Sequence, residues 1–133
     1  MSGVLLDTHI WAWSLVSPAR LSQAAISAME STSRICVSTI SLFEIGQKVR
    51  LGKWEEMAPY VNQLINLADE QSVELIPVSS AISSTAAVLD WPHRDPFDRL
   101  IGATAITEGL TLISADSAFD HLGTATFSLA RLR

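Results

Sequence analysis

The chain has 133 residues, a usual length for one domain with no room for a second, so we predict a single domain over residues 1–133. Hydrophobic residues make up 48% and charged residues 17%, which excludes a disordered or low-complexity chain. The formal net charge of −5 argues against a nucleic-acid partner, unless much of the negative charge is gathered at a site that binds cations.

The apolar segments are too short for a membrane protein. None approaches the about 20 residues of a membrane helix, and no basic segment with a long apolar run precedes Asp7. We therefore expect a cytoplasmic protein with no membrane partner. Cys36 is the only cysteine, cannot form an internal disulfide, and is predicted to be a buried small hydrophobe in a strand.

Short apolar runs alternate with segments of helical periodicity along the whole chain. Strands are predicted at 3–6, 34–38, 73–78, 110–114 and 124–128. Helices are predicted at 8–16, 21–31, 39–51, 54–71, 79–90 and 96–108, with one or two further turns within 115–122. Strands separated by helices imply a parallel sheet that is covered on both faces. The fold predicted is a three-layer α/β/α domain around a central, mostly parallel sheet of about five short strands.

Four carboxylates are predicted to meet at one edge of this sheet. Asp7 and Asp116 follow the first and fourth strands, and Glu44 lies in the first turns of the helix after the second strand. Asp98 begins the helix that leads into the fourth strand. At 1.5 Å per residue this helix of ~13 residues spans about 20 Å, roughly one strand length, so its N-terminus returns to the same edge.

Each acid also has a purely structural explanation. Those that follow the first and fourth strands could be helix N-caps, Ser41 with Glu44 fits a capping box, and Asp95 with Asp98 has the same spacing. Glu44 could also pair with Lys48 one turn later on an exposed face. Capping does not demand four carboxylates where Ser, Thr or Asn would serve, so the set taken together favours a site.

A carboxylate cluster of this kind points to Mg²⁺ or Mn²⁺ as cofactor, with one or two ions. Crowded carboxylates repel one another unless cations are supplied, and oxygen ligands suit these ions better than zinc. The histidines at 9, 93 and 121 show no ligand spacing. Because Mg²⁺ held by carboxylates usually acts on phosphates, the residues predict metal-assisted phosphodiester hydrolysis.

Four segments together resemble the PIN-domain ribonucleases, and most closely the VapC-type toxins of bacterial toxin–antitoxin pairs. They are LLDTHIWAW, VSTISLFEIGQKVRLGK, HRDPFDRLIGATAI and LTLISADSAF, in the family's order and at about its spacing. The resemblance covers nearly the whole chain. It implies an endoribonuclease that cuts RNA, a cognate antitoxin that blocks the active site, and a homodimer.

By this resemblance, Asp7, Glu44, Asp98 and Asp116 match the family's four acidic positions. Family and chemistry together predict that Asp7 and Asp98 are direct metal ligands and that Asp116 is a ligand at a second or water-bridged position. Glu44 is expected to orient the attacking water or to hold a metal-bound one.

Several neighbouring residues have two readings. Ser114 matches a hydroxyl residue that accompanies the family's last acid; like Thr8, it could hydrogen-bond a carboxylate or bound water, or be only a local cap. Asp95 is interpreted as a cap, with a place beside the metal ligands or the substrate as the alternative. Arg99 could steady a carboxylate or the scissile phosphate, or lie on the surface.

The tryptophans and basic residues also leave alternatives open. Trp11 and Trp13 pack in the core or line a groove for a partner, and Trp91 could stack on a base. The basic residues that could follow an RNA backbone, or simply form a solvated face, are Lys48, Arg50, Lys53 and Arg94.

Two other functions compete with the nuclease. One is a PIN module that binds RNA or an antitoxin without cutting, which the intact acidic set argues against. The other is a receiver-like or phosphatase-like domain with Asp7 as phosphoryl acceptor. Against the second, no Asp lies two residues after Asp7, and no Lys follows the last strand.

Overall fold

The computed structural model describes residues 3–122 and 128–131, and its centre is a five-stranded sheet. The strand order is β3-β2-β1-β4-β5, and every neighbouring pair is parallel. The strands are β1 (Val4–Leu6), β2 (Ile35–Ser38), β3 (Glu74–Ile76), β4 (Thr111–Ser114) and β5 (Ser128–Arg131). The predicted α/β fold with a parallel sheet is therefore confirmed.

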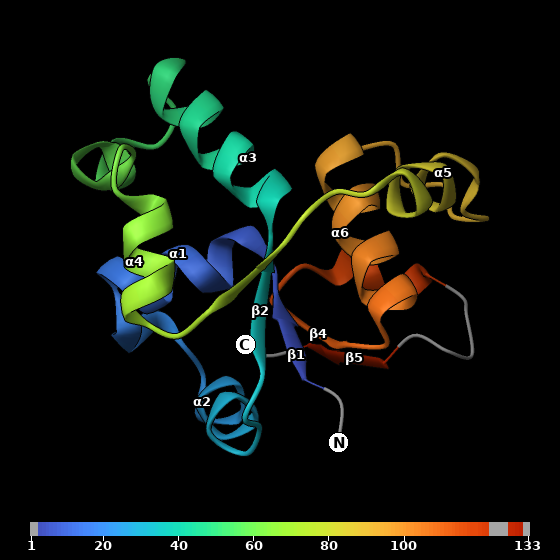
Figure 1. The fold of residues 1–133 in the computed structure, drawn as a ribbon, viewed down its shortest axis with the longest axis horizontal. Helices are drawn as coiled ribbons and strands as arrows, with labels where there is room; N and C mark the ends of the chain where they lie inside the picture. The colour runs from blue at the N-terminus through green and yellow to red at the C-terminus, as the bar shows by residue number, and fades with distance from the viewer. Residues whose placement is uncertain (1–2, 123–127, 132–133) are drawn as a thin grey trace.

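Helices connect the strands and cover both faces of the sheet (Figure 1). The α-helices are α1 (Thr8–Val16), α2 (Gln23–Glu30), α3 (Thr39–Arg50), α4 (Leu64–Glu70), α5 (Ser80–Val88) and α6 (Pro96–Glu108). Three 3₁₀ helices accompany them: η1 (Pro18–Arg20), η2 (Glu55–Tyr60) and η3 (Ser117–His121). No helix in the described part of the chain is long and apolar enough to cross a membrane.

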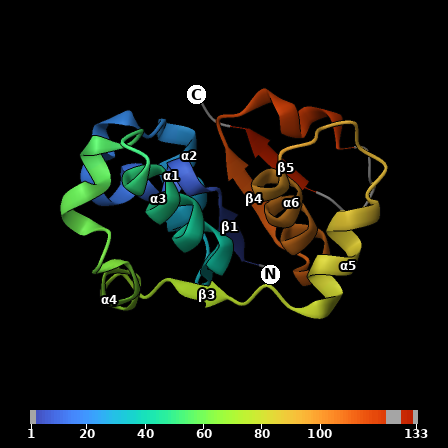
Figure 2. The ribbon, with the colours of Figure 1, turned by 90° about the horizontal axis from the view of Figure 1, so that it is seen from above.

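The core has two halves because successive residues of a strand point to opposite faces of the sheet. Val4 and Leu6 of β1 pack among residues of α1 to α4, whereas Leu5 between them packs with residues of α5 and α6. Figure 2 shows the same division from above, with α1 to α4 on one side of the strands and α5 and α6 on the other. Cys36 is buried in β2, as predicted.

One predicted element is wrong. The segment 54–71 is expected as a single helix, but the structure divides it into η2 and α4. Pro59 lies inside η2, and a proline within an α-helix has no N–H to donate and clashes with the carbonyl four residues earlier. The chain therefore takes a tighter 3₁₀ turn and starts a new helix at Leu64.

The last predicted strand is only partly tested. Of the expected segment 124–128, residues 124–127 lie outside the described part of the chain; β5 covers Ser128–Arg131, so the strand extends three residues past its predicted end. The remaining differences are of one or two residues at element ends, for example β3, which covers Glu74–Ile76 within the predicted 73–78.

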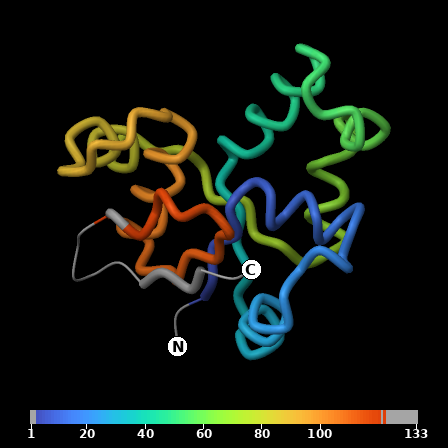
Figure 3. Tube along the Cα trace, turned by 180° about the vertical axis from the view of Figure 1, so that it is seen from behind, coloured from blue at the N-terminus to red at the C-terminus, as the bar shows by residue number. Residues whose placement is uncertain are grey.

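The strand order reverses direction at β1, which has β2 on one side and β4 on the other. Ligands of parallel α/β sheets bind beyond the carboxyl ends of the strands at such a point. Asp7 directly follows β1, and its N–H donates to the carbonyl of Ile113 in β4 at 3.1 Å. Figure 3 shows from behind that the start of α1 lies next to the chain leaving β4.

Candidate active site

The four predicted carboxylates line one cavity of about 290 Å³ at this edge of the sheet. They come from the ends of β1 and β4 and from α3 and α6, so the argument that the start of α6 returns to the edge is confirmed. The complete lining is Asp7, Thr8, His9, Trp13, Glu44, Lys48, Asp95, Asp98, Ala115 and Asp116.

Asp7 is both a helix cap and a buried carboxylate of the cavity, only 7% exposed. Its Oδ1 accepts from the N–H of Ile10 at 2.9 Å, and its Oδ2 accepts from the hydroxyl of Ser114. Burial raises the pKa of Asp7 to about 6, and the negative charges of Asp98 and Glu44 add to this, although the two hydrogen bonds oppose it. Near neutral pH this carboxyl is therefore ionised, and keeping its charge buried costs free energy.

Glu44 is buried and held from two sides. Its Oε1 accepts from the hydroxyl of Thr8 at 2.6 Å, and its Oε2 accepts from Lys48 at 2.9 Å. Ser41 lies 2.8 Å from the Thr8 oxygen, and because the Thr8 proton points to Glu44, Ser41 is the donor. The ion pair with Lys48 is the one expected if Glu44 has only a structural role. It does not lie on an exposed face, however, because Glu44 is only 5% exposed.

The capping box suggested for Ser41 and Glu44 is wrong. The N-cap of α3 is Ser38, whose hydroxyl accepts from the N–H of Ile40 at 3.1 Å. Ser41 is instead inside the helix and fully buried. Its hydroxyl donates to Thr8 and so supports the Thr8–Glu44 hydrogen bond; it does not cap the helix.

Asp98 contacts an imidazole that the sequence interpretation missed. Nε2 of His93 lies 2.6 Å from Oδ2 of Asp98. Burial raises the pKa of Asp98 to about 6; the His93 contact lowers it, and the charges of Asp95 and Asp116 raise it. The feature of the sequence that could have indicated this contact is the position of His93, in the loop directly before the helix that carries Asp98.

Asp95 is the N-cap of α6, as interpreted from the sequence. Its Oδ1 accepts from the N–H groups of Phe97 and Asp98, at 2.8 and 3.3 Å. It nevertheless lines the cavity. Among the described residues, His93, Asp95 and Asp98 form the one group of three metal-ligating side chains whose ligand atoms all lie within 4.8 Å of one another.

Asp116 is the exposed member of the set. It caps η3, where its Oδ1 accepts from the N–H of Ala118 at 2.9 Å. Its own N–H donates at 3.0 Å to the hydroxyl oxygen of Ser114, which in turn donates to Asp7. Ser114 therefore ties the first and last acids together, and both readings given for this hydroxyl apply.

Arg99 is half-buried and lies outside the cavity lining, so it is neither beside a carboxylate nor simply a surface residue, and its contact with a scissile phosphate stays a prediction. Its guanidinium donates to four backbone carbonyls, at 2.7 to 3.0 Å. The acceptors are Ala86, Leu89, Trp91 and His93. These hydrogen bonds thus fix the loop between α5 and α6 and hold the backbone of His93 near Asp98.

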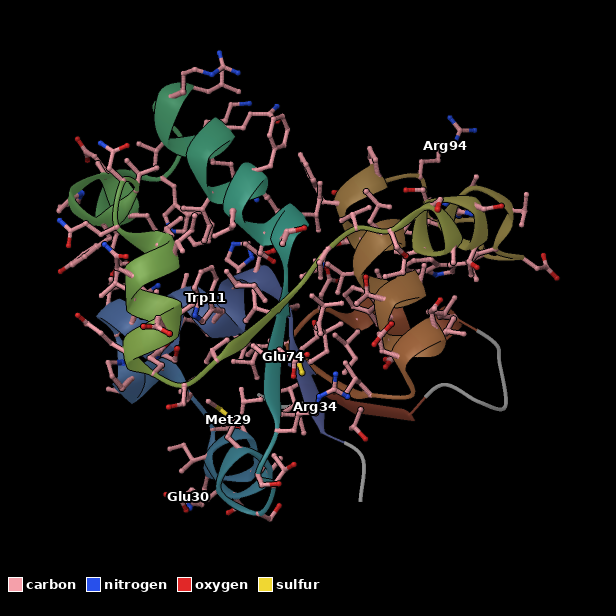
Figure 4. The ribbon with its side chains drawn as sticks, viewed as in Figure 1. Trp11, Met29, Glu30, Arg34, Glu74 and Arg94 are labelled. Atoms are coloured by element: carbon pink, nitrogen blue, oxygen red, sulfur yellow. The ribbon has the colours of Figure 1, made fainter. Side chains whose placement is uncertain are left out.

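The tryptophans divide between core and cavity. Trp11 is fully buried and donates its indole N–H to Oε1 of Gln71 at 2.9 Å; Figure 4 shows it within the layer of α1 and α4. Trp91 is 4% exposed and donates to the carbonyl of Ala118, so the idea that it stacks on a base is wrong. Trp13, by contrast, lines the cavity.

One wall of the cavity is aromatic and basic. His9 lies exposed there, with its imidazole stacked on the indole of Trp54 at a centroid distance of 4.6 Å. Partial desolvation of the imidazole by the indole rings packed against it, together with the neighbouring charge of Lys48, lowers the pKa of His9, although the charges of Glu44 and Asp116 oppose this. Of the basic residues considered for RNA, Lys48 lines the cavity, whereas Arg94 points away from the body of the molecule in Figure 4.

The residues of this cavity fit a divalent cation of the magnesium type. Asp7 and Asp98 both have pKa values raised to about 6 by burial and by neighbouring negative charge, and a cation would stabilise their ionised forms. The four predicted ligands are carboxylates, which hard cations prefer.

Comparison with known proteins gives the same result from sequence and from structure. Residues 4–125 match the model of the family described as PIN domain. Ribonuclease VapC22 of Mycobacterium tuberculosis is 36% identical over 118 residues, which are 87% of this chain and 88% of the relative.

Solved structures of known proteins share the fold. A chain in the crystal structure of VapBC-5 from Mycobacterium tuberculosis has a TM-score of 0.67 at 23% identity, covering 99% of this chain and 100% of that one. A chain in DNA-bound VapBC from Salmonella typhimurium has a TM-score of 0.71 at 17% identity, covering 98% of both. The sequence match extends over most of the chain and the fold agrees, and this protein therefore belongs to the PIN domain family.

Proposed function

We propose that this protein is a metal-dependent endoribonuclease of the VapC toxin type, formed by a single PIN domain over residues 1–133. The observation that carries the proposal is the convergence of Asp7, Glu44, Asp98 and Asp116, from four separate segments, on one cavity. The 36% identity to a protein named as a ribonuclease supports the reaction class.

The four carboxylates would hold Mg²⁺ or Mn²⁺, with one or two ions. Asp7 and Asp98 are proposed as direct ligands, Asp116 as a ligand at a second or water-bridged position, and Glu44 as the residue that orients the attacking water. When bound, the cation supplies an activated water and stabilises charge on the leaving oxygen.

The surrounding side chains are proposed to keep these carboxylates in place. Thr8 and Lys48 each bond one oxygen of Glu44, which leaves each oxygen a second lone pair for a water. Ser114 fixes Asp7 relative to the backbone of Asp116. A cavity with such fixed oxygen atoms needs little reorganisation when the phosphate arrives, which favours hydrolysis.

A cognate antitoxin is proposed as the protein partner. Its support is that the structural neighbours come from complexes described as VapBC toxin–antitoxin systems. A homodimer and a cytoplasmic location stay predictions from the sequence.

The experiment is RNA cleavage by the purified protein in Mg²⁺, Mn²⁺ or EDTA, beside an Asp98→Asn variant purified in the same way. The variant controls for contaminating nuclease. We expect discrete fragments of total cellular RNA from the wild type with metal, and none from the variant or in EDTA. Equal cleavage by both proteins would refute the assigned site. No cleavage by either, with RNA still bound, would favour the binding module.

A further inference from the structure

The wall of the cavity formed by α1 carries two aromatic side chains that the proposed hydrolysis does not use. His9 and Trp13 are four residues apart in α1, so they lie on the same face of the helix. Both line the cavity that contains the four carboxylates. His9 is exposed although it stands in the first turn of a helix whose next three residues are buried.

The ring of His9 is supported from behind. It stacks on Trp54 at 4.6 Å with an interplanar angle of 25°, and it meets Trp13 edge-on at 6.0 Å and 65°. Lys48 lies 5.5 Å from the centroid of Trp54 and is itself anchored by Glu44. These contacts fix the imidazole plane before any ligand arrives, so a second flat ring can stack with little loss of entropy.

The charge of the cavity favours a base over a phosphate as the group held at this wall. Asp7, Asp98, Asp116 and Asp95 line the same space and repel phosphate oxygens that no cation screens, and the ammonium of Lys48, which also lines it, is already paired with Glu44 at 2.9 Å. A nucleobase carries no charge and has an aromatic face, and stacking on aromatic side chains tolerates any base. The aromatic side chains of His9 and Trp13 can therefore add affinity for RNA that the carboxylates of the cavity cannot supply.

We propose that His9, backed by Trp54 and flanked by Trp13, is a stacking platform for a nucleobase next to the scissile phosphate. The inference rests on the proposed ribonuclease function and adds a base-binding position to it. His9 is a binding residue in this scheme and takes no part in bond breaking.

The direct test is proton NMR of the histidine ring in the wild-type protein at constant pH with Mg²⁺. Adenosine 5′-monophosphate should move the His9 Hε1 resonance upfield, because it would lie over the adenine ring. Ribose 5-phosphate, which has the same phosphate and no base, should leave it unmoved. The resonance is assigned by its loss in His9→Leu. Equal shifts with both ligands, or none with adenosine 5′-monophosphate, would overturn the proposal.

The second test is affinity for a fluorescent hexaadenylate, measured in an Asp98→Asn background so that no RNA is cut. Alanine-scan values for base stacking correspond to losses of about 5- to 150-fold, so His9→Leu should weaken binding by about tenfold. His9→Phe, which restores an aromatic face, should recover most of it. Affinity that is unchanged in His9→Leu would refute the platform.

Phe43→Leu is the matched control, because Phe43 is an exposed aromatic residue, 59% exposed, outside the cavity lining. Its affinity for hexaadenylate should equal that of the Asp98→Asn parent, and an equal loss at both positions would overturn the assignment to His9. The two proposals fail separately. Metal-dependent cleavage that Asp98→Asn abolishes, with no effect of His9→Leu on binding, would refute stacking and leave the ribonuclease standing.

Discussion

The buried carboxyl of Asp7 should make the metal-free protein less stable at neutral pH than at pH 4. Its ordinary pKa of 3.8 is raised to about 6 in the folded protein, mainly by burial. Between pH 4 and pH 6 the folded state therefore holds more protons than the unfolded state, so the free energy of unfolding falls as pH rises. Above pH 6 the carboxyl is ionised in both states and the full cost is present.

The size of this cost follows from the two pKa values. The rise from 3.8 to about 6, at 1.36 kcal/mol per pKa unit, corresponds to about 3 kcal/mol at pH 7. Asp7→Asn removes the ionisation, while Asn remains a good N-cap and can still contact Ser114. In EDTA the variant should therefore be more stable than the wild type by about 3 kcal/mol at pH 7 and by far less at pH 4.

The assay is urea unfolding followed by tryptophan fluorescence at both pH values. Saturating Mn²⁺ supplies the control, because it should stabilise the wild type by mass action and Asp7→Asn much less. A stability difference between the two proteins that is the same at pH 4 and pH 7 would show that the buried charge is not the cause.

Three further substitutions test other features of the fold. Arg99→Lys keeps the charge but cannot reach four carbonyls, so it should lower the free energy of unfolding by about 2 kcal/mol; an unchanged urea midpoint would contradict the role of the guanidinium. Gly3→Ala would place a Cβ atom 2.3 Å from the carbonyl oxygen of Arg34 and should cost about 1–3 kcal/mol in the same assay. Gly46→Ala, inside α3 with its nearest neighbour at 3.9 Å, should instead stabilise the protein by about 0.5–1 kcal/mol, and destabilisation there would refute the packing argument.

The placement of the four acids could be predicted from the sequence because it depends on regular geometry. Apolar runs and helical periodicity identify strands and helices, and parallel strands have their carboxyl ends at one edge of the sheet. Asp7 and Asp116 are then fixed by the ends of β1 and β4. Asp98 follows from the direction of α6, since a helix that leads into the start of β4 runs back along the sheet and so begins at the edge where the strands end.

The contacts between side chains could not be predicted in this way. The His93–Asp98 contact, the four bonds of Arg99 and the stack of His9 on Trp54 depend on how the loop residues 89–93 and 51–54 fold back. Loops have no periodicity from which to infer their course, and a one-letter pattern does not reveal the direction of a guanidinium or an imidazole.

What the sequence by itself determined is the layered α/β fold and the edge at which the carboxylates meet, because periodicity and chain direction act over whole elements. Only the tertiary structure decided which side chains hold each acid and which ring faces the cavity. These depend on contacts of 2.6 to 4.6 Å between Asp98 and the loop before α6, and between His9 and the loop after α3. The His9 contact forms only when the elements pack, since Trp54 comes from another part of the chain, and the His93 contact depends on the course of a loop that Arg99 holds by its backbone carbonyls.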